Sequence, residues 1–246
     1  MAELNVRAIV LRRTETGESD RRLTLLTQTE GKLDAVAKGA RKSGSRLAGA
    51  SDPLCVSNLT LAGGHRLRYI TQAQPEQSFR GLRTDYDRLT MALALAELYA
   101  SVIPWHEPVP DAFDLLIQSL EALESHPKPA VAFLWAQVML LNWSGFMPQL
   151  DGCVISGVPL QVDLPWLSPR AGGMLSEEEA HPFADRFRVR FEVIVALRRL
   201  PEFTAPPPNV AYVAEACAAL VPFWRAVFES PTPALDHAVS LLPTQP

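Results

Sequence analysis

Four basic side chains lie close together in a segment rich in glycine and serine near the start of the chain. They are Lys38, Arg41, Lys42 and Arg46, in and next to the sequence GARKSGSRLAGAS of residues 39–51. Cations on one loop can contact successive phosphates of a polyanion backbone. The segment has neither a helical nor a strand period and is long for a connection, which is typical of a functional or mobile loop. It therefore predicts a phosphate-binding loop.

The charge of the whole chain supports this interpretation, because it is unevenly distributed. Residues 1–80 carry 13 Lys/Arg and 8 Asp/Glu, whereas residues 81–246 carry 10 and 19. The net charges of +5 and −9 give the overall −4. Residues 21–72 contain 9 basic side chains but only Glu30, Asp34 and Asp52 as acids. A basic module attached to an acidic remainder is typical of a protein that binds nucleic acid.

We predict that eight of these basic residues contact nucleic acid. They are Arg21, Arg22, Lys38, Arg41, Lys42, Arg46, Arg66 and Arg68. An ordinary solvated surface, or a face that docks an acidic protein, is the alternative. The shortage of compensating acids and the clustering around the loop favour nucleic acid.

Aromatic residues are scarce in the basic part, which contains only Tyr69 and Phe79. Proteins that hold single strands often stack bases on aromatic rings. All five tryptophans lie later in the chain and are expected to serve packing: Trp105, Trp135, Trp143, Trp166 and Trp224. We therefore expect backbone charge, and not stacking, to dominate binding, with a steep dependence on salt.

Motifs of catalysis are missing from the sequence. It contains no G-x-x-x-x-G-K-[ST], G-x-G-x-x-G, H-E-x-x-H or G-x-S-x-G pattern, and its five histidines are dispersed. Asp85, Asp87 and Glu97 are too loosely spaced to argue for a two-metal nuclease site. We expect no enzyme, and incubation of labelled DNA with Mg²⁺ or Mn²⁺ separates a nuclease from a binding protein.

A second group of cations stands out in the acidic part of the chain. Arg186, Arg190, Arg198 and Arg199, together with Arg188, all lie in the segment 186–199. They are candidates for docking an acidic partner segment. The alternative is that they pair with nearby acids.

The elements that position the first basic group read as five short strands. Their expected ranges are 6–13, 23–29, 33–38, 54–61 and 67–73, each rich in Val, Ile, Leu and Thr and bounded by Gly or polar residues. Five short strands in one module favour a closed or nearly closed barrel, which removes exposed sheet edges.

After residue 79 the pattern becomes helical. Helices are expected over 86–102, from Asp111 onward, over 130–143 after Pro129, and over 210–229. Residues 148–175 are irregular and rich in proline and glycine, as in an inserted loop, and 185–200 alternate like a strand before they become helical. The tail beyond Pro231 is expected to be loosely ordered at its end.

Three well-separated cysteines and the lack of a signal-peptide pattern predict a reducing, cytoplasmic location. The most apolar run, residues 130–141, is too short to span a bilayer. We expect no membrane association.

Several short motifs follow one another in residues 8–53: a Gly-Glu-Ser-Asp turn at 17–20, Glu30-Gly31-Lys32, and Ala37 to Lys42 followed by Ser45-Arg46. In this combination they resemble the bacterial RecO recombination mediator family. The resemblance implies an α+β protein of two domains, with an OB-fold barrel over 1–80 and a helical domain over 81–246. It also implies four partners: single- and double-stranded DNA, RecR, single-strand-binding protein and, indirectly, RecA. The protein is then expected to associate with the nucleoid.

Many members of that family hold zinc in a Cys₄ site, in which four cysteines bind the metal. The corresponding positions here, in a degenerate zinc-finger-like loop over 148–180, are Cys153, Ser156, Ser176 and Glu179. One thiolate and two hydroxyls cannot build the site that structural zinc prefers, so we predict no metal and no cofactor. Ser176 to Glu179 reads better as a capping box that opens a helix.

Together these observations predict a non-catalytic DNA-binding protein of recombinational repair. The resemblance implies that it anneals complementary strands and helps to load RecA onto DNA covered by single-strand-binding protein, with RecR. The alternative is an adaptor whose basic barrel mainly docks acidic proteins.

Overall fold

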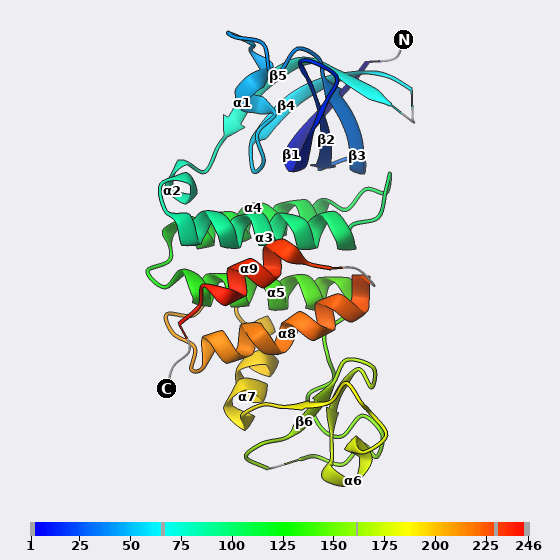
Figure 1. Cartoon of the computed structure of the whole chain (residues 1–246), viewed down its shortest axis with the longest axis vertical. Coiled ribbons are helices and arrows are strands. Elements are labelled where there is room, and N and C mark those ends of the chain that lie inside the picture. Colours follow the sequence, from blue (N-terminus) through cyan, green and yellow to red (C-terminus); the bar gives the residue numbers. More distant parts are fainter. Residues whose placement is uncertain (1–2, 65–66, 161, 229–230, 244–246) are drawn as a thin grey trace. The chain divides into compact units, whose positions relative to one another are not determined.

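The structure is a computed structural model that describes residues 3–64, 67–160, 162–228 and 231–243. The chain divides into two compact units, Met1–Glu124 and Ser125–Pro246. Figure 1 shows a strand-rich part that includes the N-terminus, followed by helices and a small sheet. Each unit is described by itself.

The first unit contains a closed barrel of five strands in the order β1-β2-β3-β5-β4. The strands are β1 (Glu3–Thr16), β2 (Asp20–Thr27), β3 (Gly31–Ala37), β4 (Val56–Gly63) and β5 (Arg68–Gln77), with the short helix α1 (Leu47–Ala50) between β3 and β4. All neighbours pair antiparallel except β3 and β5. The predicted barrel is confirmed.

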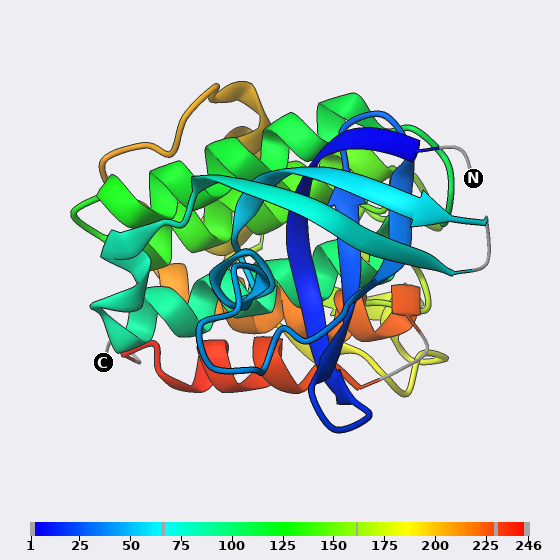
Figure 2. The same ribbon diagram turned by 90° about the horizontal axis from the view of Figure 1, so that it is seen from above.

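Alternating side chains fill the barrel. On β2 and β3 the core is formed by Leu23, Leu25, Leu33, Ala35 and Ala37, which alternate with residues on the outer face, as a strand period of two requires. Leu4 of β1, which pairs with Leu61 of β4, packs against the same core. β1 bends across the barrel (Figure 2), and its register with β2 shifts between Val10 and Arg12. A bulge of this kind increases strand curvature, which helps a small sheet to close.

The barrel closes at a short seam. β3 pairs with β5 only through Ala35 with Arg68 and Val36 with Tyr69. Toward the start of β3, Lys32 instead forms a parallel bridge with Trp105. A Cβ on Gly31, whose φ is +66°, would lie 1.8 Å from the carbonyl oxygen of Glu107. The segment around Trp105 therefore fills the side of β3 that β5 leaves free, and glycine is required next to it.

Three helices complete the first unit: α2 (Arg80–Arg83), α3 (Tyr86–Val102) and α4 (Pro110–Ser125), the last of which ends one residue past the unit boundary. The Asp85 side chain caps α3 by accepting from the backbone N–H of Arg88, at 3.1 Å. α3 packs against β1. The barrel strands end at Gln77, but the compact unit continues to Glu124 because these helices pack with the barrel.

The second unit contains α5 (Pro129–Ser144), α7 (Phe191–Arg199), α8 (Val213–Phe228) and α9 (Pro233–Ser240), with the 3₁₀ helix η1 (Leu200–Glu202). α5 is buried nearly all along its length, as its uniformly apolar sequence predicts. α8 packs against α5, α7 and α9. α9 was not expected from the sequence, and its Leu235 and Ala238 are buried.

Residues 148–175, expected to be irregular, contribute two strands to a small sheet in the order β7-β6-β8. The strands are β6 (Trp166–Ser168), β7 (Gly173–Leu175) and β8 (Phe187–Arg188), with the short helix α6 (Glu177–Ala180) beside them. The third strand, β8, and the helix after it lie in 185–200, where a strand and then a helix were expected. The Ser176 side chain accepts from the Glu179 N–H at 3.3 Å, which confirms the predicted cap. None of the helices in the described part of the chain is long and apolar enough to cross a membrane.

Candidate nucleic-acid interface

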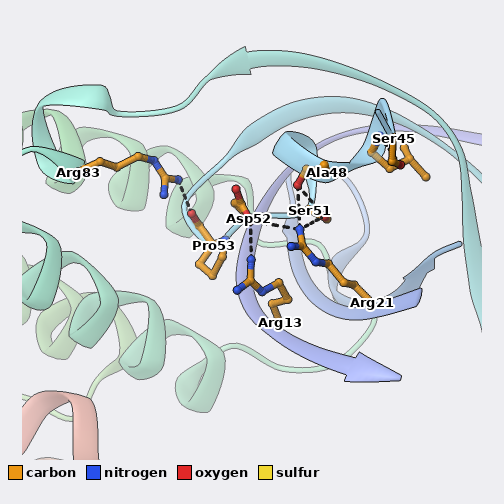
Figure 3. Close-up of polar contacts among 9 residues, drawn as sticks. Arg13, Arg21, Ser45, Ala48, Ser51, Asp52, Pro53 and Arg83 are labelled. Atoms are coloured by element: carbon orange, nitrogen blue, oxygen red, sulfur yellow. Dashed lines mark hydrogen bonds and ion pairs between the residues drawn. The ribbon is translucent and has the colours of Figure 1, made fainter. Parts of the chain in front are cut away.

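Arg21, one of the predicted contact residues, is built into the fold. Its Nη1 donates to the carbonyl oxygen of Ala48 at 2.9 Å and to Ser51 Oγ at 2.6 Å, and it lies 3.2 Å from Asp52 Oδ1 (Figure 3). Its side chain is only 16% exposed. Arg21 therefore ties α1 and the residues after it to β2, and its Nη1 is occupied by partners within the first unit.

Asp52 and Pro53 accept hydrogen bonds from two further arginines (Figure 3). Arg13 Nη1 lies 2.5 Å from Asp52 Oδ1, and Arg83 Nη2 donates to the Pro53 carbonyl at 2.7 Å. The carboxylate of Asp52 thus serves two guanidinium groups. These contacts fix the chain between α1 and β4, where it leaves the basic loop.

Three more of the predicted residues have acidic partners. Arg22 pairs with Asp34 at 2.6 Å, Arg41 with Glu15 at 3.3 Å, and Arg68 with Glu30 at 4.0 Å. Arg22 and Arg41 remain exposed enough to reach a ligand, whereas the Arg68 side chain is 12% exposed. Exposed ion pairs are weak, so Arg22 and Arg41 can exchange their partners for phosphates at little cost.

Lys38, Lys42 and Arg46 differ from the paired arginines because all three are exposed and none has an acidic partner among the described residues. They belong to the basic loop, defined here as residues 38–46. The loop backbone is fixed, since Asp20 Oδ1 accepts from the Gly39 N–H at 2.7 Å and the Ser19 carbonyl accepts from the Arg41 N–H at 2.9 Å. A fixed backbone that carries unpaired cations is suited to bind phosphates.

Lys38 contacts one of the two aromatic residues of the basic part of the chain. Lys38 Nζ lies 4.3 Å from the centroid of the Tyr69 ring, and Tyr69 is half-buried. Phe79 is buried and cannot stack on a ligand. The eighth predicted residue, Arg66, lies outside the described residues. The structure thus brings Lys38, Arg41, Lys42 and Arg46 to one loop and gives Arg21 a supporting position.

The arginines of the second unit mostly have partners of their own. Arg190 Nε lies 3.0 Å from Glu215 Oε2, and Arg198 Nε lies 3.0 Å from Asp151 Oδ1. Arg186 donates to the Phe183 carbonyl at 2.9 Å, and Arg188 pairs with Glu177 at 2.7 Å; both guanidinium groups lie over the Trp166 ring.

Arg199 is exposed and has no acidic partner among the residues that the structure describes. It borders a hollow of about 750 Å³ on α7 and the segment after it. The apolar lining of this hollow includes Leu164, Val195, Leu200 and Phe203.

Comparison with known proteins places this sequence in a family. The family described as "Recombination protein O N terminal" matches residues 1–79, and "Recombination protein O C terminal" matches residues 83–220. The chain belongs to the RecO family. The boundary between the two matched regions coincides with the end of the barrel.

Curated RecO proteins are similar over most of their length. The DNA repair protein RecO of Heliobacterium modesticaldum is 38% identical over 197 residues, which cover 78% of this chain and 71% of that protein. Those of Gloeobacter violaceus and Bifidobacterium animalis subsp. lactis are 33% and 34% identical, over 82% of this chain and 78% and 84% of theirs. This RecO family chain is thus a DNA repair protein.

The Cys₄ zinc site implied by the RecO resemblance does not fit the residues of this chain. A ZnCys4 centre needs four thiolates, and Cys153 is the one cysteine at the four corresponding positions. The other two cysteines, Cys55 and Cys217, are buried and free. In the described part of the chain no group of three or more His, Cys, Asp or Glu side chains could hold a metal ion.

The residues at the corresponding positions are hydrogen-bonded to one another. Ser176 Oγ already accepts from the Glu179 N–H, so this hydroxyl serves as a helix cap. Burial raises the pKa of Cys153, but hydrogen bonds from the Ser156 hydroxyl and from the N–H groups of Ser156, Ser176 and Ile155 outweigh it and lower the pKa to about 7. Hydrogen bonds and packing therefore hold this loop.

Two features of the first unit of this RecO family protein were not predicted from the sequence. Lys32 is buried at 4% exposure, whereas Trp105, expected to serve packing, is 49% exposed. No local signal marks either residue, because both depend on the bridge between β3 and a segment far away in the sequence. The acidic partners of the arginines also come from distant strands, and only the excess of basic residues was visible in the sequence.

Proposed function

We propose that this RecO family chain is a non-catalytic DNA-binding protein of recombinational repair that holds DNA phosphates on its basic loop. One observation carries the proposal. Lys42 and Arg46 are exposed cations, without acidic partners among the described residues, on a loop whose backbone is anchored to Asp20 and Ser19. Their free charge is available to replace the counterions of a nucleic-acid backbone.

The mechanism we propose is charge neutralisation. Cations that contact phosphates of two strands lower the repulsion between them and leave the bases free to pair, which promotes annealing of complementary strands. The resemblance that introduced this family supports RecR and single-strand-binding protein as partners and assistance in loading RecA. Both single- and double-stranded DNA are expected to bind, because both have a phosphate backbone.

The test compares two double variants that change charge equally. Lys42→Glu/Arg46→Glu alters the basic loop, and Arg80→Glu/Arg170→Glu alters exposed arginines outside it. If about five phosphates are contacted, the slope of log affinity against log salt should be about −3.5 to −4.5 for the wild type. Loss of two contacts should reduce the magnitude of that slope by about 1.4 to 1.8.

The two variants give distinguishable outcomes. Weaker DNA binding and slower annealing for the loop variant alone support the proposal. Equal effects of both variants would point to general charge and not to the loop, and a wild-type slope near zero would refute charge neutralisation. RecR binding measured on the loop variant separates the adaptor, which predicts loss of RecR with DNA binding intact.

A docking site for an acidic tail is a second candidate function, in the second unit. It is favoured by Arg199, which has no acidic partner among the described residues and borders a largely apolar hollow whose lining also includes Asp163 and Glu192. The tail of single-strand-binding protein is the partner we propose. Arg186, Arg190 and Arg198 contribute less because their guanidinium groups are already engaged.

Single variants of neighbouring arginines test this second candidate. Arg199→Glu should weaken binding of an acidic tail peptide, whereas Arg198→Glu, which removes a pair with Asp151, should have a smaller effect. Unchanged peptide affinity in both variants would discard the site. DNA binding should be the same in both, which separates this surface from the basic loop.

A further inference from the structure

Trp105 is an exposed aromatic side chain of the first unit, and its contacts do more than pack it into the core. It follows α3 in the chain and is 49% exposed, although tryptophan is usually well buried. A large exposed aromatic ring is often a binding element. The contacts around Trp105 show whether neighbouring residues hold the ring in a fixed position.

The backbone around Trp105 is clamped to β3 on both sides. The Lys32 N–H donates to the Pro104 carbonyl at 3.4 Å, and the His106 N–H donates to the Lys32 carbonyl at 2.9 Å. His106 adopts a φ of +60°, which is unfavourable for a residue other than glycine and needs support from its surroundings. The two hydrogen bonds to Lys32 supply that support, so the segment holds one conformation.

The ring itself is also held. Lys32 Nζ lies 4.6 Å from the centroid of the Trp105 ring and donates to the Ala100 carbonyl at 2.6 Å. The lysine covers one face of the ring, and half of the side chain stays in solvent. Lys32 fixes the ring on one face, and the rest of the ring is accessible. Such a side chain loses little conformational entropy when it stacks on a flat ligand.

Exposed cations lie on the strands of the same barrel. Arg12 of β1 is exposed, and its Nη2 donates to Ser101 Oγ at 3.4 Å, four residues before Trp105 in the chain. Arg22 of β2 is also exposed and donates to Asp34 of β3 at 2.6 Å. A rigid aromatic ring on a surface that also carries exposed cations is the combination that binds single-stranded nucleic acid.

β3 connects the ring to the basic loop. Lys32 lies at its start and Lys38 just after its end, and each places its ammonium over an aromatic ring, Trp105 and Tyr69 respectively. Six residues of strand span roughly 20 Å. That length is within the site sizes of several nucleotides that OB-folds cover.

We propose that Trp105 is a stacking site for an unpaired base of single-stranded DNA, whose backbone runs along β3 to the basic loop. The inference rests on the proposed DNA-binding function and deepens it. Charge on the loop holds any phosphate backbone, whereas the Trp105 ring selects strands whose bases are unpaired.

The experiment uses the full chain and three probes of equal length: oligo(dT), an abasic deoxyribose phosphate oligomer, and a DNA duplex. Trp105→Ala should weaken oligo(dT) binding about 5- to 150-fold, leave the salt slope unchanged, and have no effect on the abasic oligomer or the duplex. Trp105→Phe should retain most of the affinity. Phe146→Ala, which removes an equally exposed ring from the second unit, is the matched control.

A measurement on the wild type avoids dependence on folding of the variants. Irradiation with an oligonucleotide that contains 5-bromodeoxyuridine should crosslink the base to Trp105, found by mass spectrometry of the peptides. Crosslinks confined to other peptides would overturn the proposal, as would equal losses on all three probes.

These experiments distinguish failure of the stacking site from failure of the proposed DNA-binding function. If Trp105→Ala binds oligo(dT) like the wild type while Lys42→Glu/Arg46→Glu binds weakly, the stacking site is wrong and the basic loop stands. The ring is then left as a surface for a protein partner. If the wild type binds none of the probes, both are wrong.

Discussion

The guanidinium group of Arg21 lies 3.2 Å from the carboxylate of Asp52 and donates to the carbonyl oxygen of Ala48 beside it. This relationship joins β2 to the chain that returns from the basic loop. Arg21 therefore supports the loop from within, while Lys42 and Arg46 present their charges to solvent. The predicted cations thus divide into those that build the site and those that are free to bind.

Loss of Arg21 should cost stability. Arg21→Ala leaves the Ala48 carbonyl without its charged donor and removes one of the two guanidinium groups at Asp52, where Arg13 remains. We expect a loss of about 2 kcal/mol in the free energy of unfolding, measured with urea. Arg22→Ala is the control, since the Arg22 side chain is 56% exposed and its pair with Asp34 should contribute about 0.5 kcal/mol. A larger loss for Arg22→Ala would contradict the supporting position of Arg21.

The seam of the barrel should be sensitive to a single methyl group. Gly31→Ala would place a Cβ 1.8 Å from the Glu107 carbonyl, and we expect it to destabilise the protein by about 3 kcal/mol or more. Gly17→Ala has a similar positive φ but nothing within 4 Å, so it should cost only the backbone strain of about 1 kcal/mol. Thermal unfolding of both variants measures the difference, and similar losses would show that the close approach is unimportant.

Lys32 should make stability depend on alkaline pH. Burial, with a smaller contribution from the charge of Arg12, lowers the pKa of Lys32 to about 8, from 10.5. Between these values the unfolded chain binds more protons than the folded one, so stability rises with pH. The wild type should gain about 1.5 kcal/mol relative to Lys32→Met between pH 8 and 9.5. A difference between the two proteins that is constant with pH would argue against a lowered pKa.

The chain should hold no zinc, and three substitutions should create a site. After exposure to Zn²⁺ and gel filtration, we expect the wild type to retain no stoichiometric metal, because Cys153 is the one thiol among the four corresponding positions. Ser156→Cys/Ser176→Cys/Glu179→Cys should retain about one ion per chain, since Cys153 is hydrogen-bonded to residues at two of those positions. Stoichiometric zinc in the wild type, measured by mass spectrometry, would refute this.

Much of the fold was predictable because the signals are local. The helix over 86–102 has the bounds expected from its unbroken run of helix-forming residues, and the Ser176 cap follows from a spacing of three residues. The five strands lie where alternation and glycine turns predict them. α9 was missed because its short apolar pattern lies near the C-terminus, where loose order was expected.

The sequence by itself determined the excess of positive charge, the strands of the barrel and the scarcity of aromatic residues within it. Only the tertiary structure decided which cations are free, because Arg21 finds its partners 27 to 31 residues away and Arg41, in the basic loop, finds Glu15 on β1. It also brought Trp105 to the seam beside Lys32, which lies far earlier in the sequence. The physical reason is that strand patterns and caps depend on neighbours in the chain, whereas burial and ion pairing depend on neighbours in space.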